Sequence, residues 1–404
     1  MKTLDKLCFS VLTISVSFTF GQISYQHPND IGIENNSSVI FAEMFEQNDV
    51  PSMISTVGYQ TSQMQSHINF DPSVPLGSLG SQSLKLTAVE NSSASNDPSE
   101  DANILKKFNS GISDSVFVRY YVKYNSNFSF HHSGVWMGGT DPANQCWPCN
   151  IPGRTIPISG DSAFVIGTEI RGLANQSAQT NSIFGFYNYW MDMNPYLTGS
   201  NAGQYFGNEF LNSGLNDNIN MDQWNCIEVM IKLNNPVSAS NGELKLWING
   251  ALISHHGYLF PTGTWDEAHF IEGTGLPFSG FRWRSNPAVV FNYIWLKNYS
   301  TNNTSSAPND VLYDHVVVAK DYIGPIYNPT NQLNEIENKT FSIYPNPVNE
   351  TLNFSEYLED FTIKNNLGQE ILKGIGNSIS IERLESGIYY LEFNLKLYKF
   401  IVQK

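Results

Sequence analysis

The 404-residue sequence is poor in charge, because only 15% of its residues are Asp, Glu, Lys or Arg. Basic residues are the scarcer kind: 22 Lys and Arg stand against 37 Asp and Glu, which gives a formal net charge of -15. Phosphate binding needs a basic surface, so this balance argues against nucleic acid as a partner. It also disfavours a polyanionic substrate, unless cations are concentrated locally.

Cysteine is scarce as well, with four in the chain. Cys146 and Cys149 form a CxxC in a loop rich in Pro and Asn, without a following helix that would lower a thiol pKa. This context disfavours a redox role and favours a local structural bridge or free thiols, with Cys226 left over. A zinc site that adds His131 or His132 is an alternative supported only by the CxxC spacing.

The sequence also lacks an apolar run long enough for a comfortable transmembrane helix. A short run, Leu7 to Phe20, follows Lys2 and Lys6 and precedes Gly21, which is the pattern of a secretory signal peptide. We therefore expect residues 1–21 to be a signal peptide. The protein would be exported through the periplasm and be secreted or held at the outer cell surface.

Long amphipathic helices are missing too, and strands with turn residues between them fill most of the chain. We therefore predict an all-β protein whose main part is a large two-sheet β-jelly roll. The predicted divisions are a polar, loosely ordered leader, the jelly roll, a linker and a small C-terminal β-unit, at residues 22–38, 39–327, 328–340 and 341–404.

The clearest strand is Ser115 to Tyr124, in which apolar and polar residues alternate strictly. One face carries Val and Tyr and suits a core. The other carries Phe117, Arg119, Tyr121 and Lys123, two cations between aromatic rings, and we expect it to line a substrate groove. Arg119, Tyr121 and Lys123 are therefore predicted substrate-binding residues.

The C-terminal 64 residues contain several motifs in a fixed order: YPNP at 344–347, LG at 367–368, GIY at 387–389 and Lys399 near the end. They resemble the type A C-terminal sorting domain of the bacterial type IX secretion system. The resemblance implies an Ig-like β-sandwich, the type IX machinery as a partner and a Bacteroidetes-type source. A plain terminal β-sandwich module is the alternative.

The larger part of the chain resembles the polysaccharide lyase-like jelly rolls of the concanavalin A-like superfamily. The motifs that carry the resemblance are TEIR at 168–171, the pair His131 and His132, and YNY at 187–189. The Gln-x-His strand of alginate-lyase relatives is missing, and the Tyr/Lys strand lacks its lysine. The resemblance implies a secreted protein that acts on an extracellular polysaccharide, as a lyase if it is an enzyme.

β-Elimination on a uronate needs a cation to neutralise the carboxylate, a base and an acid. We assign Arg171 or Arg119 to neutralisation, His131 or His132 to the base, and Tyr187 or Tyr189 to the acid. Each residue also has a structural interpretation, such as an Arg171–Glu169 ion pair or tyrosines in the core. A retaining glucanase is disfavoured, because no Glu-x-Asp-x-x-Glu run occurs.

The remaining predictions concern binding. Glu169, Trp190, Arg282 and Arg284 join the predicted substrate-binding residues, with Trp190 as a sugar-stacking ring. A structural calcium between the first and last strands would take oxygen ligands from Glu43, Glu46 and Asp314. A monomer is expected. The alternative to an enzyme is a non-catalytic carbohydrate-binding or surface-adhesion module, and a third hypothesis is a protein-binding sandwich with an exposed apolar patch.

Overall fold

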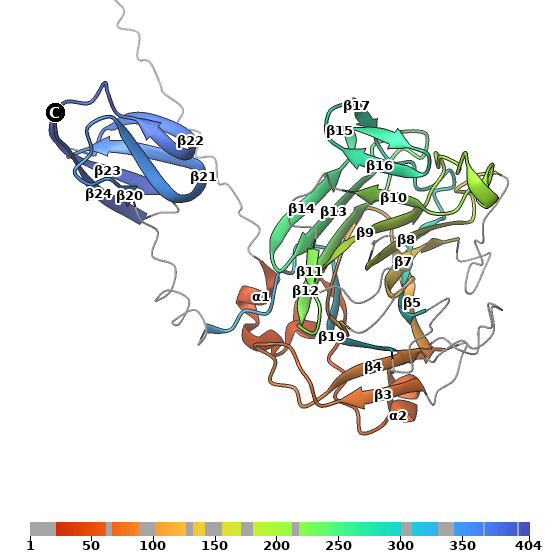
Figure 1. The fold of residues 1–404 in the computed structure, drawn as a ribbon. Helices are drawn as coiled ribbons and strands as arrows, with labels where there is room; N and C mark the ends of the chain where they lie inside the picture. The colour runs from red at the N-terminus through yellow and green to blue at the C-terminus, as the bar shows by residue number, and fades with distance from the viewer. Residues whose placement is uncertain are drawn as a thin grey trace, which may run out of the picture. The chain divides into compact units, whose positions relative to one another are not determined.

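The computed structural model describes residues 22–61, 67–88, 102–126, 132–141, 156–170, 181–211, 218–299, 309–329, 343–366, 368–393 and 396–404. The chain divides into two compact units, Met1–Tyr327 and Asn328–Lys404, which are drawn in Figure 1. The described part is mainly β-structure, which confirms the predicted all-β class.

The first sheet of the N-terminal unit has eight strands in the order β14-β13-β12-β6-β19-β4-β3, with β1 also paired to β19. Their bounds are β1 Val39–Glu43, β3 Ile68–Asp71, β4 Ser83–Ala88, β6 Ser115–Tyr124, β12 Asn225–Lys232, β13 Glu243–Ile248, β14 Ala251–His256 and β19 Asn309–Ala319. β6 lies between β12 and β19, antiparallel to both. The strongly alternating segment is therefore a central strand, as the sequence predicts.

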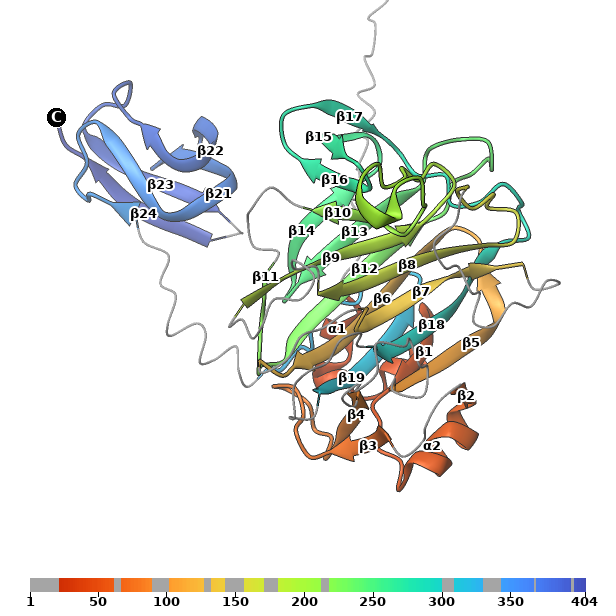
Figure 2. The same ribbon diagram turned by 45° about the vertical axis from the view of Figure 1, so that its right-hand side comes forward.

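The second sheet has eleven strands in the order β17-β15-β16-β10-β9-β8-β7-β18-β5-β2, with β11 paired to β9. Their bounds are β2 Tyr59–Gln60, β5 Ala102–Ile112, β7 Gly134–Thr140, β8 Ala163–Ile170, β9 Asn181–Tyr189, β10 Asn208–Leu211, β11 Asn218–Asn220, β15 Tyr258–Asp266, β16 His269–Glu272, β17 Leu276–Ser279 and β18 Val290–Asn298. β8, β7 and β18 lie side by side in Figure 2.

Helices are few and short in the described residues. They are α1 Ile23–Gln26, α2 Val50–Val57 and the 3-10 turns Pro28–Asp30, Ile33–Asn35 and Gly199–Asn201. α2 is bounded by clear local signals, because the Asp49 side chain accepts a hydrogen bond from the Ser52 backbone N–H and Gly58 ends the helix at φ 74°.

The main core lies between the two sheets. Val118, Tyr120 and Val122 of β6 are fully buried and belong to one apolar cluster with Ile166 of β8. The Tyr120 hydroxyl lies 2.7 Å from the hydroxyl of Thr168 on β8, so a buried hydrogen bond joins the sheets. The face of β6 that carries Val and Tyr therefore points into the core, as predicted.

The opposite face of the eight-stranded sheet is covered by the N-terminal segment. Ile23 and Ile33 are buried in a second apolar cluster with Val317, Ala319 and Ile323. The backbone N–H of Ile23 also donates to the Tyr322 carbonyl at 3.1 Å. The expectation of a loosely ordered leader is therefore wrong: its isoleucines bury apolar surface against β19 and the residues that follow it.

The C-terminal unit contains a five-stranded sheet of β20 Ile343–Tyr344, β21 Thr351–Asn365, β22 Glu370–Ser380, β23 Gly387–Phe393 and β24 Lys396–Val402. It has its own apolar core of Val348, Leu352, Phe354, Leu358, Phe361, Ile363, Ile381, Leu384, Leu391, Phe400 and Val402. A separate core allows this small unit to fold by itself.

Candidate functional site

One face of the eleven-stranded sheet points away from the sandwich core. Thr168 of β8 reaches the core through Tyr120, so its neighbours Gly167 and Glu169 point outward. Residues directly opposite each other on paired strands share a face. Trp136 of β7 and Tyr187 of β9 both pair with Gly167, which places these two rings outward as well.

The outward rings form a continuous band that we call the aromatic face: Trp136, Tyr187, Tyr189, Tyr293 and Trp295. Trp295 of β18 pairs with Trp136, and Tyr293 continues the same face two residues earlier. Ring centroids are 6.1 Å apart for Trp136 and Trp295, 5.9 Å for Trp136 and Tyr187, and 5.6 Å for Tyr187 and Tyr189. Such a band suits a sugar chain, whose rings have apolar faces.

Two glycines allow these rings to lie against the sheet. A Cβ on Gly167 would come 2.9 Å from Nε1 of Trp136, and one on Gly207 would come 2.3 Å from the Tyr187 ring. A side chain at either position would push a ring away from the backbone. The positions of both rings therefore depend on these glycines.

A histidine–carboxylate pair lies beside the aromatic face. Nδ1 of His132 is 2.9 Å from one Glu169 oxygen, and Nε1 of Trp136 donates to the other at 2.7 Å. Glu169 is fully buried, whereas the His132 side chain keeps 18% of its surface exposed. Because the carboxylate accepts from Nδ1–H, the neutral ring carries its lone pair on Nε2, the nitrogen that can take up a proton.

The backbone of His132 is in the left-handed region, with φ 57°. Few residues other than glycine adopt this conformation, and those that do cluster at functional sites. It lies where the chain enters β7. This conformation aims the imidazole at Tyr187, with ring centroids 4.7 Å apart.

The two tyrosines of β9 can supply protons. Burial raises the pKa of Tyr189, although hydrogen bonds with Tyr187 and the Gly207 backbone act in the opposite direction. Tyr189 therefore stays a neutral phenol, able to donate, over the pH range in which most enzymes work. Of the predicted catalytic residues, the structure brings His132, Tyr187 and Tyr189 together.

Sequence analysis missed four residues of this site: Trp136, Tyr293, Trp295 and Lys297. Nζ of Lys297 lies 3.9 Å from the Trp136 ring centroid, 4.2 Å from that of Trp295 and 5.6 Å from that of Tyr299. The signal was available, since Tyr293, Trp295 and Lys297 alternate along β18 as aromatics and cations do along β6.

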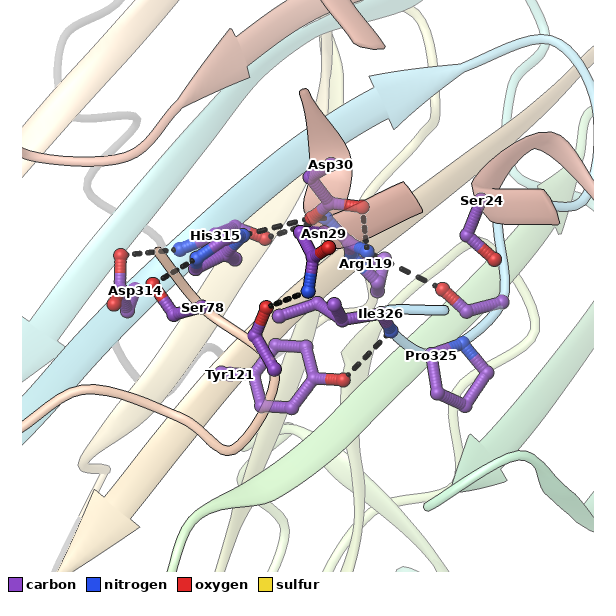
Figure 3. A network of polar contacts seen from close by, with 12 residues as sticks. Ser24, Asn29, Asp30, Ser78, Arg119, Tyr121, Asp314, His315, Pro325 and Ile326 are labelled. Atoms are coloured by element: carbon purple, nitrogen blue, oxygen red, sulfur yellow. Dashed lines mark hydrogen bonds and ion pairs between the residues drawn. The ribbon is translucent and has the colours of Figure 1, made fainter. Parts of the chain in front are cut away.

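The predicted groove on β6 is wrong, because the N-terminal segment covers that face. Arg119 is fully buried, and its guanidinium pairs with Asp30 and donates to the Gly324 and His315 carbonyls, as Figure 3 shows. The Tyr121 hydroxyl accepts from the Ile326 backbone N–H at 2.8 Å. Arg119 and Tyr121 are thus structural residues, not substrate-binding ones.

The burial of this cluster shifts its acid–base equilibria. Burial by itself would raise the pKa of Asp30, but the Arg119 charge and the His315 and Arg119 hydrogen bonds lower it to about 2. Burial lowers the pKa of His315, against the effect of Asp30. Its imidazole is neutral and engages Asp30 through Nδ1 at 2.7 Å and Ser78 through Nε2 at 2.8 Å.

Two other predicted binding residues also have structural partners. Trp190 is buried in the core, 5.0 Å from the Phe281 ring, and its Nε1 donates to Asn208. Arg284 is buried and donates to backbone carbonyls, with Val289 the nearest at 2.8 Å. The predictions for Trp190 and Arg284 are wrong, because both side chains are buried inside the protein.

The remaining predicted binding residues lie apart from the aromatic face. Arg282 is about one third exposed and forms a two-pronged ion pair with Asp192. Lys123 is half-buried on the outer face of β6, where Nζ donates to the Ser73 hydroxyl at 3.4 Å. The described contacts of these two side chains do not include His132 or Glu169.

Some predictions fall outside the described residues, namely those for His131, Arg171, Cys146 and Cys149. Cys226 is a buried free thiol on β12, and burial raises its pKa to about 12. A thiol so protonated is a poor nucleophile.

The acids predicted to bind calcium make hydrogen bonds within the protein. Glu43 accepts from the Phe45 N–H at 2.7 Å, Glu46 from Ser81 at 2.9 Å, and Asp314 from the His315 N–H at 2.7 Å. Within the described ranges, no group of three His, Cys, Asp or Glu side chains is arranged to hold a metal ion. The geometry there gives the calcium prediction no support.

Comparison with solved structures finds proteins with similar folds at low sequence identity. The marine PL-14 alginate lyase from Aplysia kurodai is 13% identical, with a TM-score of 0.44 over 70% of this chain and 100% of that chain. Alginate lyase vAL-1 from Chlorella virus is 14% identical (TM-score 0.42; 70% and 100%). Endo-beta-1,4-glucuronan lyase from Trichoderma reesei is 13% identical (TM-score 0.37; 70% and 97%). No curated protein matches the chain.

The C-terminal unit matches a family directly. Residues 342–404 match the family model described as "Secretion system C-terminal sorting domain". No helix in the described part of the chain is long and apolar enough to cross a membrane. The predicted sorting domain is thus confirmed, and the protein is one that is exported, to be secreted or attached at the cell surface.

Proposed function

We propose that the aromatic face acts on an extracellular, uronate-containing polysaccharide by β-elimination. The observation that carries this proposal is the hydrogen-bonded His132–Glu169 pair beside Tyr187. Glu169 fixes the tautomer and orientation of the imidazole, as a buried carboxylate does for a histidine base. The pair thus supplies a base, and the tyrosines supply an acid, within one side-chain cluster.

In the proposed step, Nε2 of His132 removes the C5 proton of a uronate unit. The electron pair of that C–H bond forms the C4=C5 double bond, and the C4–O glycosidic bond breaks. The leaving oxygen takes a proton from the hydroxyl of Tyr187, and Tyr189 lies beside it to support the phenolate. The products are an unsaturated sugar acid and a new chain end, so no water or cofactor is consumed.

The aromatic face would hold the polymer during this step. Trp136, Trp295 and Tyr187 would contact the sugar chain through the parts of their rings that remain exposed, and such contacts fix position without requiring one particular hydroxyl pattern. Stacking alone would be enough for a non-catalytic carbohydrate-binding or adhesion module. That second candidate shares the aromatic face but does not need a base held by Glu169.

The first test is to incubate the full chain with alginate, glucuronan and pectate and to follow the ultraviolet absorbance of the unsaturated product. We expect a rise with at least one polymer, reduced at least about 100-fold in His132→Gln. His255→Gln is the matched control, because His255 forms a similar 2.9 Å pair with Glu243 at the edge of the other sheet.

A flat trace with retarded migration in gels containing one polymer would favour the binding module. If no polymer gives an absorbance change and none retards migration, the proposal is overturned. An absorbance rise that His132→Gln leaves unchanged would overturn the assigned base.

A further inference from the structure

We propose that Lys297 recognises the carboxylate of the bound sugar acid and so makes the aromatic face selective for uronates over uncharged sugars. This inference rests on the proposed function, in that it assigns the charged contact of the same site. Sequence analysis gave that role to Arg171 or Arg119. Arg171 lies outside the described residues, and Arg119 is buried behind the other sheet.

The sheet register places Lys297 in line with the histidine–carboxylate pair. Lys297 of β18 is directly opposite Gly134 of β7, and Gly134 is directly opposite Glu169 of β8. The three residues form one row on the outward face, with Lys297 and Glu169 two strands, or about 10 Å, apart. Gly134 has no side chain, so β7 puts nothing between the two charged residues in that row.

Aromatic rings hold the ammonium at this end of the row. Nζ lies within 4.2 Å of the centroids of Trp136 and Trp295, and the residue is only 8% exposed. Each ring face attracts a cation, so these contacts position the ammonium. Holding a long side chain in place beforehand also lowers the entropy lost when an anion binds.

The same rings connect Lys297 to the proposed catalytic group. Trp136 lies against the ammonium of Lys297 and donates its Nε1–H to Glu169, which in turn holds His132. A sugar bound beside Trp136 would therefore have the cation on one side and the imidazole on another. In β-elimination the carboxylate is attached to the carbon that loses the proton, so both groups have to reach one sugar unit.

The other described cations are placed differently. Arg119 is paired with Asp30, Arg282 with Asp192, and Lys123 belongs to the opposite sheet. Lys107 of β5 pairs with Tyr293, two rows from Lys297 on the aromatic face, or about 13 Å along the strand. Among the described cations, Lys297 is thus the one that lies in the same row as Glu169. The chain as a whole has a net charge of -15.

The test compares alginate, glucuronan and pectate as free acids and as methyl esters, which remove the charge but keep the sugar and linkage. Affinity of the full chain is measured by gel retardation, and KM and kcat where there is turnover. We expect wild type to prefer the free acid, and Lys297→Met to lose that preference through an affinity about 10- to 100-fold weaker for the free acid alone. Lys297→Arg keeps the charge and should keep most of the preference.

Lys123→Met is the control, since it removes a strand lysine from the other sheet. If Lys297 has a purely structural role, Lys297→Met and Lys297→Arg should both lower thermal stability but leave the ratio of acid to ester affinity unchanged. That result would overturn the inference. If wild type cleaves a polymer and Lys297→Met keeps the wild-type ratio, the inference fails while the proposed function stands. If wild type binds the acid through Lys297 but cleaves nothing, the lyase proposal fails and the carboxylate contact stands.

Discussion

Two of the histidine–carboxylate pairs in the N-terminal unit have nearly the same geometry, one on each sheet. Behind the eight-stranded sheet, His315 Nδ1 is 2.7 Å from Asp30; on the eleven-stranded sheet, His132 Nδ1 is 2.9 Å from Glu169. Both carboxylates are fully buried, but the His315 side chain is 4% exposed and that of His132 is 18% exposed.

The difference between the two lies in what surrounds them. The N-terminal segment lies over the first pair and supplies Asp30 itself, and both ring nitrogens of His315 have protein partners, Asp30 and Ser78. The second pair lies on a face of aromatic rings and reaches the surface through His132. The same residue types thus stabilise the fold in the first pair and, under the proposed function, supply the base in the second.

The largest effect is expected for Arg119→Met, which tests whether the covered pair of Asp30 and His315 is structural. The substitution leaves Asp30 as a buried carboxylate without its cation, which should lower the free energy of unfolding by about 3–5 kcal/mol. The measurement is urea unfolding followed by tryptophan fluorescence. Combining it with Asp30→Asn should restore much of the loss, because the uncompensated charge is gone; a double variant as unstable as the single one would contradict this account.

Glu169→Gln is the corresponding change on the aromatic face. It removes the negative charge that holds the His132 tautomer, so we expect the kcat for the uronate polymer to fall by about 10²- to 10⁴-fold. KM should change little, because the stacking rings remain. A kcat within threefold of wild type would show that Glu169, like Asp30, is only structural.

A third prediction concerns pH and the back of the eight-stranded sheet. Burial raises the pKa of Glu228 to about 7, although the Ile323 and Gly324 N–H groups and Arg119 oppose the shift. The folded state therefore holds this proton more tightly than the unfolded chain does. Its contribution is complete below the unfolded value of about 4.5 and is lost as pH rises through about 7, on the order of 3 kcal/mol.

Unfolding free energies at pH 5 and pH 8.5 check this sign, with Glu228→Gln expected to reduce the fall between them. Burial also raises the pKa of Asp314, to about 8, so part of the decline should persist in that variant. Asp30 has the opposite sign: with its pKa lowered to about 2, its contribution is present above about 3.8 and is lost as pH falls. Because the lowered pKa of His315 acts in the opposite direction over this range, the decisive comparison is between wild type and Glu228→Gln; the same pH dependence in both would contradict the assignment.

The smallest expected effect is that of Lys123→Met. Lys123 shares its strand and alternation with Arg119, but it is half-buried and its described contact is one hydrogen bond to Ser73. We expect a change in unfolding free energy within about 0.5 kcal/mol and unchanged activity. A large loss of polymer binding would restore the β6 face as a substrate surface and weaken the distinction between the sheets.

Three of the residues that the chain pattern singles out lie together in the candidate site. His132, Tyr187 and Tyr189 were chosen from short motifs, and the structure brings them together beside Glu169. The partners Trp136 and Lys297 were missed because their roles depend on pairing between β7 and β18, which are about 160 residues apart along the chain. Local alternation does not reveal which distant strand will be the neighbour.

By itself the sequence determined the all-β class, the central strand Ser115–Tyr124 and the sorting domain, because alternation and ordered motifs are local properties. Alternation also gave that strand two faces, but not their surroundings. Arg119 meets Asp30 across 89 positions and His315 across 196, through contacts that exist only after the sheets assemble. The tertiary structure alone decided that the N-terminal segment covers this face, because burial depends on which distant segment packs over a strand.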